Sequence, residues 1–225
     1  MMQEPSKLRI IYEDKYILVM HKAAGVATQT KKLSEMDVLS YVKNYLDGGY
    51  VGIINRLDRQ VEGLVLLAKS SGMAAKLTEQ LNQHKIEKNY CARVYIDKSN
   101  SGVLSDSFVT LEDYIFTDKL SNTSRICDAT VNDAKLARLE YKMTDMDIKD
   151  GFDIADLDIR LITGRHHQIR VQLSHAGMPI LGDMKYGSEA SVKYSEDNDI
   201  SVINLKAYRL KFVHPATGVD MTFTI

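Results

Sequence analysis

Cysteine is scarce in this chain, whose 225 residues contain only Cys91 and Cys127. The two lie in unlike sequence contexts, without CxxC spacing and without a nearby pair of histidines of the zinc-binding type. This pattern argues against both a disulfide framework and a cysteine-based metal site. We interpret the two cysteines as structural residues.

Long apolar runs are also missing, and there are only three prolines. No run approaches the roughly 20 apolar residues that a membrane-spanning helix needs. The opening residues MMQEPSKLRIIYEDK place acidic side chains on both sides of a short apolar stretch, which fits neither a secretory signal nor a transit peptide. With 44% hydrophobic and 26% charged residues, the composition is that of a globular protein. We predict a cytoplasmic protein without a membrane partner.

A strong excess of positive charge is absent as well. The chain has 29 Lys and Arg residues and 30 Asp and Glu residues, which gives a net charge of -1. This balance argues against a protein that coats nucleic acid by bulk attraction. The charge is nevertheless segregated. Residues 144–158 hold six Asp and one Lys, whereas residues 159–182 hold three Arg, three His and no acid. Any site for a polyanion must therefore be local.

Patterns typical of β-strands dominate the chain. They are runs in which apolar and polar residues alternate, or runs rich in β-branched and aromatic residues, and turn residues bound them. Residues 8–22 predict two short strands around Glu13-Asp14-Lys15, followed by a loop with Gly25. Further strands are expected at residues 63–69, 89–96, 137–143, 152–163, 202–213 and 219–225, the last two separated by the turn sequence HPATG. Residues 98–135 show only weak hydrophobic patterning, and we expect hairpins and loops there.

Three helices are expected between these strands. The first spans residues 38–46, with a cap at Ser34 and an end at Gly48-Gly49. The second places Met73, Leu77 and Leu81 on one face, and the third covers residues 167–176. Few helices among many strands predict an α+β fold with a mixed, mainly antiparallel sheet. At this length, one domain built from two lobes is as plausible as a single compact unit.

Two segments combine polar residues that can take part in catalysis or binding with glycines and apolar runs. The first is Ile54-Asn-Arg-Leu-Asp-Arg59, which is followed by Gly63 and the apolar run into Lys69. The second is LITGRHHQIRV, residues 161–171, which continues through GMPILGD, residues 177–183, to Tyr186-Gly187. A third, shorter string is Lys88-Asn-Tyr-Cys-Ala92.

These segments resemble the motifs of RluA-type pseudouridine synthases. The first resembles HRLDxxTSGLLLxAK, the second resembles LxTGRxHQIRVHLxxxGxPIxGDxxYG almost without gaps, and the third resembles KxYxA. Glu13-Asp14, Lys22 and Gly25 resemble the family's EDxxxxxxxKPxG stretch. The resemblance runs from about residue 8 to the C-terminus and implies a pseudouridine-synthase fold, with a sheet bent into two lobes and a central catalytic cleft. It further implies one catalytic domain over residues 1–225 without an additional N-terminal RNA-binding domain.

The chain departs from the family pattern at several motif positions. Asn55 replaces a His, Val61-Glu62 replaces Thr-Ser, and Ala23-Ala24 replaces a Pro-containing pair. Gln172 also replaces a His, and Leu205-Lys206-Ala207 replaces a Leu-His-Ala triplet. Glu62 adds a negative charge close to the catalytic loop. The departures therefore leave open which RNA the enzyme accepts.

The resemblance implies that the chain isomerises uridine in ribosomal or transfer RNA, with Asp58 as the catalytic carboxylate. An ionised Asp can attack the anomeric carbon of the sugar or help remove a ribose proton so that a glycal forms, and the sequence leaves both routes open. A carboxylate that stays ionised in a dry pocket needs a fixed cation, for which Arg170 is the candidate. Tyr90 would stack on the flipped uracil and assist proton transfer.

RNA contacts are expected from basic residues around these motifs. Arg56 shares the loop of Asp58 and is the candidate to fill the space that an extruded nucleotide leaves. Arg59 lies beside it, and Arg165, His166 and His167 are expected to face phosphates. The expected partner is RNA, without DNA, and the expected state is a monomer. The reaction needs no cofactor and no metal.

Alternatives remain for single residues and for the whole chain. Without its context Asp58 would be read as a surface ion-pair residue, Arg56 as a salt-bridging residue and Tyr90 as core. We dismiss His166-His167 as a metal pair, because adjacent residues point different ways and no third ligand has suitable spacing. The alternative functions are a catalytically silent RNA-binding or ribosome-assembly module of the same fold, and an enzyme acting on a free nucleoside or nucleotide. The second lacks a Gly-rich phosphate loop.

Overall fold

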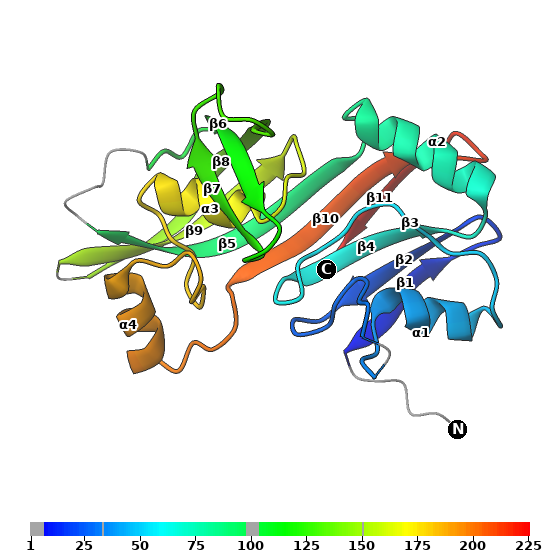
Figure 1. The fold of residues 1–225 in the computed structure, drawn as a ribbon, viewed down its shortest axis with the longest axis horizontal. Helices are drawn as coiled ribbons and strands as arrows, with labels where there is room; N and C mark the ends of the chain where they lie inside the picture. Colours follow the sequence, from blue (N-terminus) through cyan, green and yellow to red (C-terminus); the bar gives the residue numbers. More distant parts are fainter. Residues whose placement is uncertain (1–6, 33, 98–103, 150) are drawn as a thin grey trace. The chain divides into compact units, whose positions relative to one another are not determined.

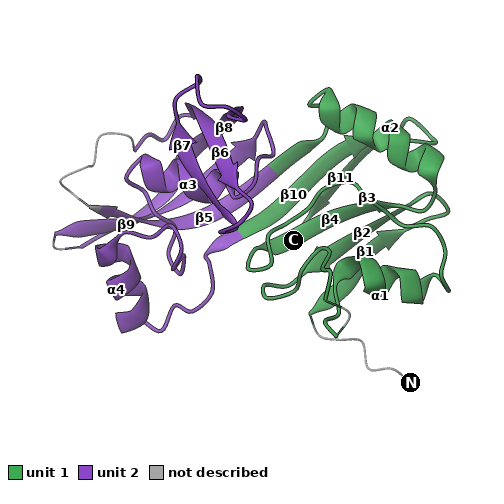
Figure 2. Ribbon diagram, viewed as in Figure 1, with its two compact units in different colours: residues 1–88, 206–225 green, residues 89–205 purple. Residues whose placement is uncertain are grey.

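The computed structural model describes residues 7–32, 34–97, 104–149 and 151–225. The chain divides into two compact units, coloured separately in Figure 2. Unit 1 comprises Met1–Lys88 and Lys206–Ile225, and unit 2 comprises Asn89–Leu205. Among the described residues, no helix is long and apolar enough to span a membrane.

Unit 1 contains a mixed sheet (Figure 1). Its strands are β1 (Leu8–Glu13), β2 (Ile17–Lys22), β3 (Gly52–Ile53), β4 (Glu62–Ala68), most of β10 (Leu205–Val213), and β11 (Asp220–Thr224). They pair in the order β1-β2-β4-β10-β11, with β3 also pairing with β4. Among the described strand pairs of this unit, β4–β10 is parallel and the others are antiparallel.

The core of unit 1 forms because β2 and β4 are apolar along almost their whole length. On one face, helix α2 (Ser71–Asn82) places Leu77 in a cluster of buried strand residues. The side chains that alternate to the opposite face are buried too, so both strands are covered on both sides. These opposite-face residues are Leu18, Met20, Val65 and Leu67.

Helix α1 (Val38–Tyr45) begins at a different residue from the one that the sequence predicted. Asp37, not Ser34, is the N-cap: its carboxylate accepts a 2.7 Å hydrogen bond from the Ser40 backbone N–H. The Ser40 hydroxyl in turn accepts from the Asp37 backbone N–H at 3.2 Å. This reciprocal capping box satisfies two donors at once, which explains why the helix begins here.

The described residues of unit 2 form an antiparallel sheet and two helices (Figure 1). The strands pair in the order β5-β9-β8-β6-β7, and the first two residues of β5 belong to unit 1. Their bounds are β5 (Glu87–Asp97), β6 (Val109–Asp118), β7 (Thr123–Cys127), β8 (Lys135–Ile148) and β9 (Phe152–Leu161). The helices are α3 (Gln168–His175) and α4 (Glu189–Asp197).

The predicted α+β class and the mixed, mainly antiparallel sheet are confirmed. Helix α4 was not predicted. The region expected to hold hairpins contains the β6–β7 hairpin, and its residues 98–103 lie outside the described residues. The bend of the sheet, the central cleft and the single-domain organisation stay predictions.

Candidate active-site residues in two units

In unit 1, Asp58 lies on a short turn between β3 and β4. Its carbonyl accepts a hydrogen bond from the Val61 N–H at 3.1 Å. On the other side, the buried Thr28 hydroxyl donates to the Leu57 carbonyl at 2.9 Å and accepts from the Leu57 N–H at 3.1 Å. Leu57 and Val61 are themselves buried. The turn is therefore anchored immediately before and shortly after Asp58.

Asn55 ties the start of the same turn to β4. Its buried amide donates to the Leu64 carbonyl at 3.1 Å and accepts from the Leu66 N–H at 2.8 Å. A side-chain amide can donate and accept in this bridging geometry. At the position where the family motif has His, this chain has a residue that holds the turn.

Gly63 ends the turn where β4 meets β10 at close range. Its φ is +143°, and a Cβ atom placed there would lie 2.5 Å from the Ala207 carbonyl oxygen. Only glycine accommodates both this backbone conformation and this approach. The contact aligns Glu62 with Lys206 and Gly63 with Ala207 in the parallel pair.

Glu62 contacts a basic side chain on each side. Its Oε1 lies 3.0 Å from His21 Nε2 on β2 and 3.2 Å from Lys206 Nζ on β10. Burial raises the pKa of the Glu62 carboxyl, but the hydrogen bonds from His21 and Lys206 outweigh that effect and hold the pKa below its ordinary value. Glu62 and Lys206, two departures from the family motifs, are therefore partners of one another. The charge of Glu62 is compensated locally.

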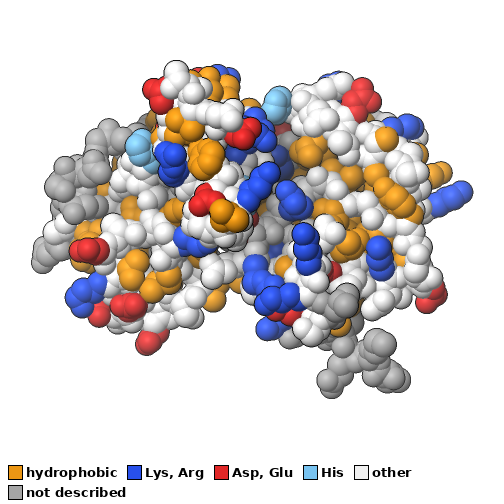
Figure 3. Space-filling model, viewed as in Figure 1, with side chains coloured by type: hydrophobic (Ala, Val, Ile, Leu, Met, Phe, Trp, Pro, Cys, Tyr) orange, Lys and Arg blue, Asp and Glu red, His pale blue; other side chains and the backbone are white. Residues whose placement is uncertain are grey.

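The two arginines of the turn differ in their surroundings. Arg56 is exposed, whereas the exposed Arg59 guanidinium pairs with Glu35, which also pairs with Lys32 at 3.0 Å. On the face of unit 1 that Figure 3 shows, Lys and Arg side chains are more prominent than acidic ones.

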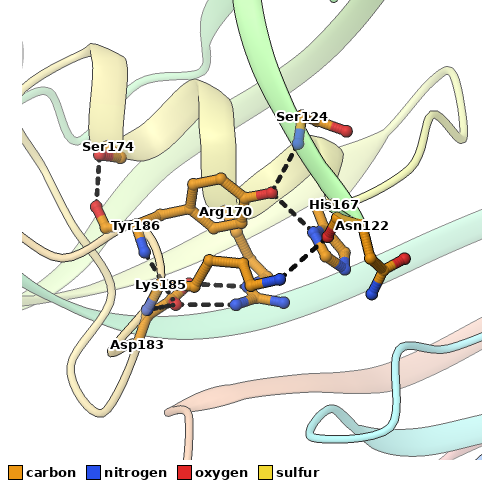
Figure 4. A network of polar contacts seen from close by, with 8 residues as sticks. All are labelled: Asn122, Ser124, His167, Arg170, Ser174, Asp183, Lys185 and Tyr186. Carbon is orange, nitrogen blue, oxygen red and sulfur yellow. Dashed lines mark hydrogen bonds and ion pairs between the residues drawn. The ribbon is translucent and has the colours of Figure 1, made fainter. Parts of the chain in front are cut away.

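In unit 2, Arg170 on α3 forms a buried, two-pronged ion pair with Asp183 (Figure 4). Nε donates to Asp183 Oδ2 at 2.7 Å, and Nη2 donates to Oδ1 at 2.8 Å. The side chains are 5% and 1% exposed. Asp183 Oδ1 also accepts the backbone N–H groups of Lys185 and Tyr186, at 3.0 and 3.2 Å. Asp183 thus fixes both the arginine fork and the turn that follows it.

Tyr186 joins this pair to the hairpin of β6 and β7. The Arg170 guanidinium lies 4.9 Å from the centroid of the Tyr186 ring, and the tyrosine hydroxyl accepts from the Ser124 N–H at 2.8 Å. The same hydroxyl lies 2.7 Å from His167 Nδ1 (Figure 4). Lys185 donates to the Asn122 carbonyl at 2.9 Å, so two residues of this turn bind the hairpin.

The two adjacent histidines lie together, contrary to the expectation that they point different ways. Their rings stack with centroids 3.7 Å apart, because His167 adopts a left-handed backbone conformation with φ of 54°. His166 Nδ1 lies 2.9 Å from the Ser124 hydroxyl. Within the described ranges, no group of three or more His, Cys, Asp or Glu side chains has a metal-binding arrangement.

The remaining predicted residues of unit 2 lie on or beside its sheet. Tyr90 on β5 is 5% exposed and aligns with Ile159 of β9. Arg165 is exposed, and its Nε donates to the Leu136 carbonyl at 2.8 Å. His167 is buried and His166 half-buried, which makes Arg165 the most accessible of the three residues expected at phosphates.

The predicted residues are thus divided between the two units. Unit 1 holds Asp58, Arg56 and Arg59, and unit 2 holds Tyr90, Arg165, His166, His167 and Arg170. Sequence reasoning quoted Lys22, Asp183 and Tyr186 as motif residues without giving them a role. Their signal was present, since each is a polar residue inside a matched motif.

Comparisons with known proteins agree on one family. The sequence model described as RNA pseudouridylate synthase matches residues 16–175. The tRNA pseudouridine synthase C of Haemophilus ducreyi is 31% identical over 222 residues, which cover 97% of this chain and 90% of the relative. The ribosomal large subunit pseudouridine synthase C of Buchnera aphidicola from Acyrthosiphon pisum is 29% identical over 219 residues. That match covers 93% of this chain but only 64% of the relative.

Solved structures agree on the fold. Human RNA pseudouridylate synthase domain containing 1 superposes with a TM-score of 0.75 at 19% identity, covering 99% of this chain and 86% of the human chain. Human RNA pseudouridylate synthase domain containing 4 gives a TM-score of 0.71 at 20% identity, covering 96% and 87%.

Proposed function

Because the chain belongs to the RNA pseudouridylate synthase family, we propose that it isomerises uridine to pseudouridine in RNA, with Asp58 as the catalytic carboxylate. The observation that carries the proposal is the anchored turn on which Asp58 lies. Thr28 clamps the residue before Asp58, and the N–H of Val61 bonds to its carbonyl. A catalytic side chain needs such a fixed backbone, because loss of orientation raises the barrier.

The reaction requires few catalytic groups. A glycosidic bond is broken, the uracil turns, and a carbon-carbon bond forms to the same sugar, so no net oxidation, hydrolysis or energy input is involved. An ionised carboxylate serves either as the nucleophile at the anomeric carbon or as the group that removes a ribose proton. Both routes require the same residue in the same ionisation state.

Arg170 is the proposed cationic partner of Asp58. Its ion pair with Asp183 engages Nε and Nη2, and a guanidinium has five N–H donors in a fixed fork. Asp183 therefore sets the orientation of the guanidinium. A guanidinium beside a carboxylate favours the ionised form of that carboxylate.

The proposed substrate is ribosomal RNA or transfer RNA, because relatives named for each class match this chain. The test is to incubate the purified protein with unmodified transcripts of both classes and to quantify pseudouridine by nucleoside chromatography. We expect pseudouridine in one class at substoichiometric enzyme. RNA that is bound but never modified would overturn the proposal and favour the silent RNA-binding alternative.

Tyr90→Phe is expected to slow turnover by roughly 100-fold, the loss typical of a missing acid-base group, while RNA affinity changes little. The variant keeps the aromatic face and removes only the hydroxyl. The measurement is a single-turnover rate together with a binding isotherm. Tyr95→Phe is the matched control, since Tyr95 is also buried on β5 but packs its ring on Phe152. Equal losses in Tyr90→Phe and Tyr90→Leu would make Tyr90 a packing residue.

Arg56→Ala is expected to slow modification of a uridine in a stable stem-loop far more than of the same uridine in an unstructured oligonucleotide. Extruding a stacked, paired base costs a few kcal/mol, and a side chain that fills the gap matters in proportion to that cost. The measurement is the ratio of single-turnover rates on the two RNAs at two salt concentrations.

Arg9→Ala removes a similarly exposed charge from β1 of the same unit and is the control. A plain phosphate contact predicts equal losses on both RNAs and a shallower salt dependence of binding. If the rate ratio in Arg56→Ala equals that of the wild type, the gap-filling role is wrong.

A further inference from the structure

Two departures from the family motifs meet at the start of β4. Glu62 stands where the motif has Ser, and Lys206 stands where it has the His of a Leu-His-Ala triplet. The parallel pairing of β4 with β10 aligns Glu62 with Lys206, so the two departures are direct neighbours (Figure 1). One brings a negative charge and the other brings a permanent positive charge. Together the two new charges sum to zero.

The Glu62 carboxylate is contacted from the strands on both sides of β4. Its Oε1 lies 3.2 Å from Lys206 Nζ on β10 and 3.0 Å from His21 Nε2 on β2. Although burial raises the pKa of Glu62, hydrogen bonds from His21 and Lys206 hold it below the ordinary value, so the carboxylate is ionised at neutral pH. The side chains of Glu62 and Lys206 are 37% and 35% exposed. Both charges therefore act on whatever binds beside them.

The charge of Glu62 lies close to the turn that carries Asp58. Glu62 follows Asp58 by four residues, so their Cα atoms are at most about 14 Å apart. Burial lowers the pKa of the Lys22 ammonium to about 8, and attraction by both Asp58 and Glu62 opposes this shift, which places the two carboxylates around one buried group. Charges act over about 8 Å at physiological ionic strength and over about 30 Å at about 0.01 M salt. A phosphate that approaches Asp58 therefore comes within range of Glu62.

On the premise of the proposed function, we propose that Lys206 supports RNA binding indirectly, by neutralising Glu62 so that phosphates can approach the turn of Asp58. Lys206 acts through Glu62. Without Lys206, the ionised Glu62 repels a phosphodiester chain, and without Glu62, the released Lys206 attracts one. A contribution to folding does not explain the pair, because half-exposed ion pairs stabilise proteins only slightly.

The test measures affinity for a fluorescent stem-loop RNA with uridines in its loop, at about 50 mM and about 200 mM salt, a range over which phosphate contacts weaken strongly. The proteins are the wild type, Lys206→Met, Glu62→Gln and the double variant. Each replacement keeps the approximate shape of the side chain and removes its charge. At the lower salt, Lys206→Met should weaken binding about five-fold, the upper end of what an exposed charge pair contributes. Glu62→Gln should tighten binding.

The double variant distinguishes an indirect role of Lys206 from a direct one. It should bind RNA within about two-fold of the wild type, because each replacement removes the charge that the other one compensates. A double variant as weak as Lys206→Met would show that Lys206 holds a phosphate itself, and this would overturn the proposal. Equal affinities in all four proteins would overturn it as well. The expected differences should shrink at the higher salt.

Lys211→Met is the matched control. Lys211 lies on the same strand, about 16 Å further along, and it pairs with Glu87 at 3.1 Å with 37% of its side chain exposed. The control loses the same charge and a similar ion pair, and its affinity should stay within about two-fold of the wild type. A loss equal to that of Lys206→Met would reduce the effect to net charge and contradict the proposal. Urea unfolding of both lysine variants checks that neither loss is one of folding.

Turnover separates this inference from the proposed function. In single-turnover reactions, the half-saturating RNA concentration of Lys206→Met should rise by the same factor as its dissociation constant. A lower rate at saturating RNA would instead show that Lys206 holds the turn, and would contradict the proposal. Proteins that follow the expected order of affinities but form no pseudouridine refute the proposed function and leave the role of Lys206 intact. Pseudouridine formation with the same RNA dependence in the wild type and Lys206→Met refutes the role of Lys206 and leaves the proposed function intact.

Discussion

Asp58→Asn is expected to abolish pseudouridine formation, with a loss of at least about a thousand-fold in the single-turnover rate. The amide has nearly the same shape as the carboxylate, but it is neither nucleophilic nor basic. The turn itself should persist, because Thr28, Leu57 and Val61 hold it through backbone groups and buried side chains. RNA affinity and the urea midpoint should therefore stay close to those of the wild type.

Asp47→Asn is the matched control for this change of charge. Asp47 is exposed after α1 in the same unit, and its left-handed backbone with φ of 50° suits asparagine. This control should retain full activity. Turnover by Asp58→Asn above a thousandth of the wild-type rate would remove Asp58 from the catalytic role.

Arg170→Ala is expected to have the largest effect on stability. It leaves the Asp183 carboxylate buried without its arginine, and breaking a buried ion pair from one side costs roughly 3 to 5 kcal/mol. The backbone N–H groups of Lys185 and Tyr186 still reach Asp183, so the turn is weakened and not wholly lost. Urea unfolding measures the change in free energy, and activity should fall as well.

Two further variants separate charge from geometry. Arg170→Lys restores the charge without the fork and should recover part of the stability. The double variant Arg170→Ala, Asp183→Ala should be less unstable than the sum of the two single variants, because residues in direct contact do not act additively. An Arg170→Ala protein with the unfolding midpoint and activity of the wild type would show that neither Asp183 nor Asp58 depends on this arginine.

Local pattern was enough to predict most of the strands and three helices. The apolar runs of β2 and β4 are buried because each is hydrophobic along its length, a property visible in sequence. Helix α4 lacked that signal. Its buried residues are serines, and the Gly182 N–H donates a 3.0 Å hydrogen bond to Ser195 Oγ. Its ring contact with the sheet comes from Tyr194, which packs on Tyr95 and Phe152. A periodicity of apolar residues therefore never appears there.

The sequence by itself determined the family, the α+β class, and the choice of Asp58, Tyr90 and Arg170 as candidates, because these rest on contiguous strings of residues. Only the tertiary structure decided which residues are partners. Strand register aligns Glu62 with Lys206, and the folded turn after α3 brings Asp183 to Arg170. Burial brings Lys22 under the turn of Asp58 and lowers its pKa to about 8. Ion pairing and pKa depend on distances and on exclusion of water, and neither exists until segments remote in the chain have packed together.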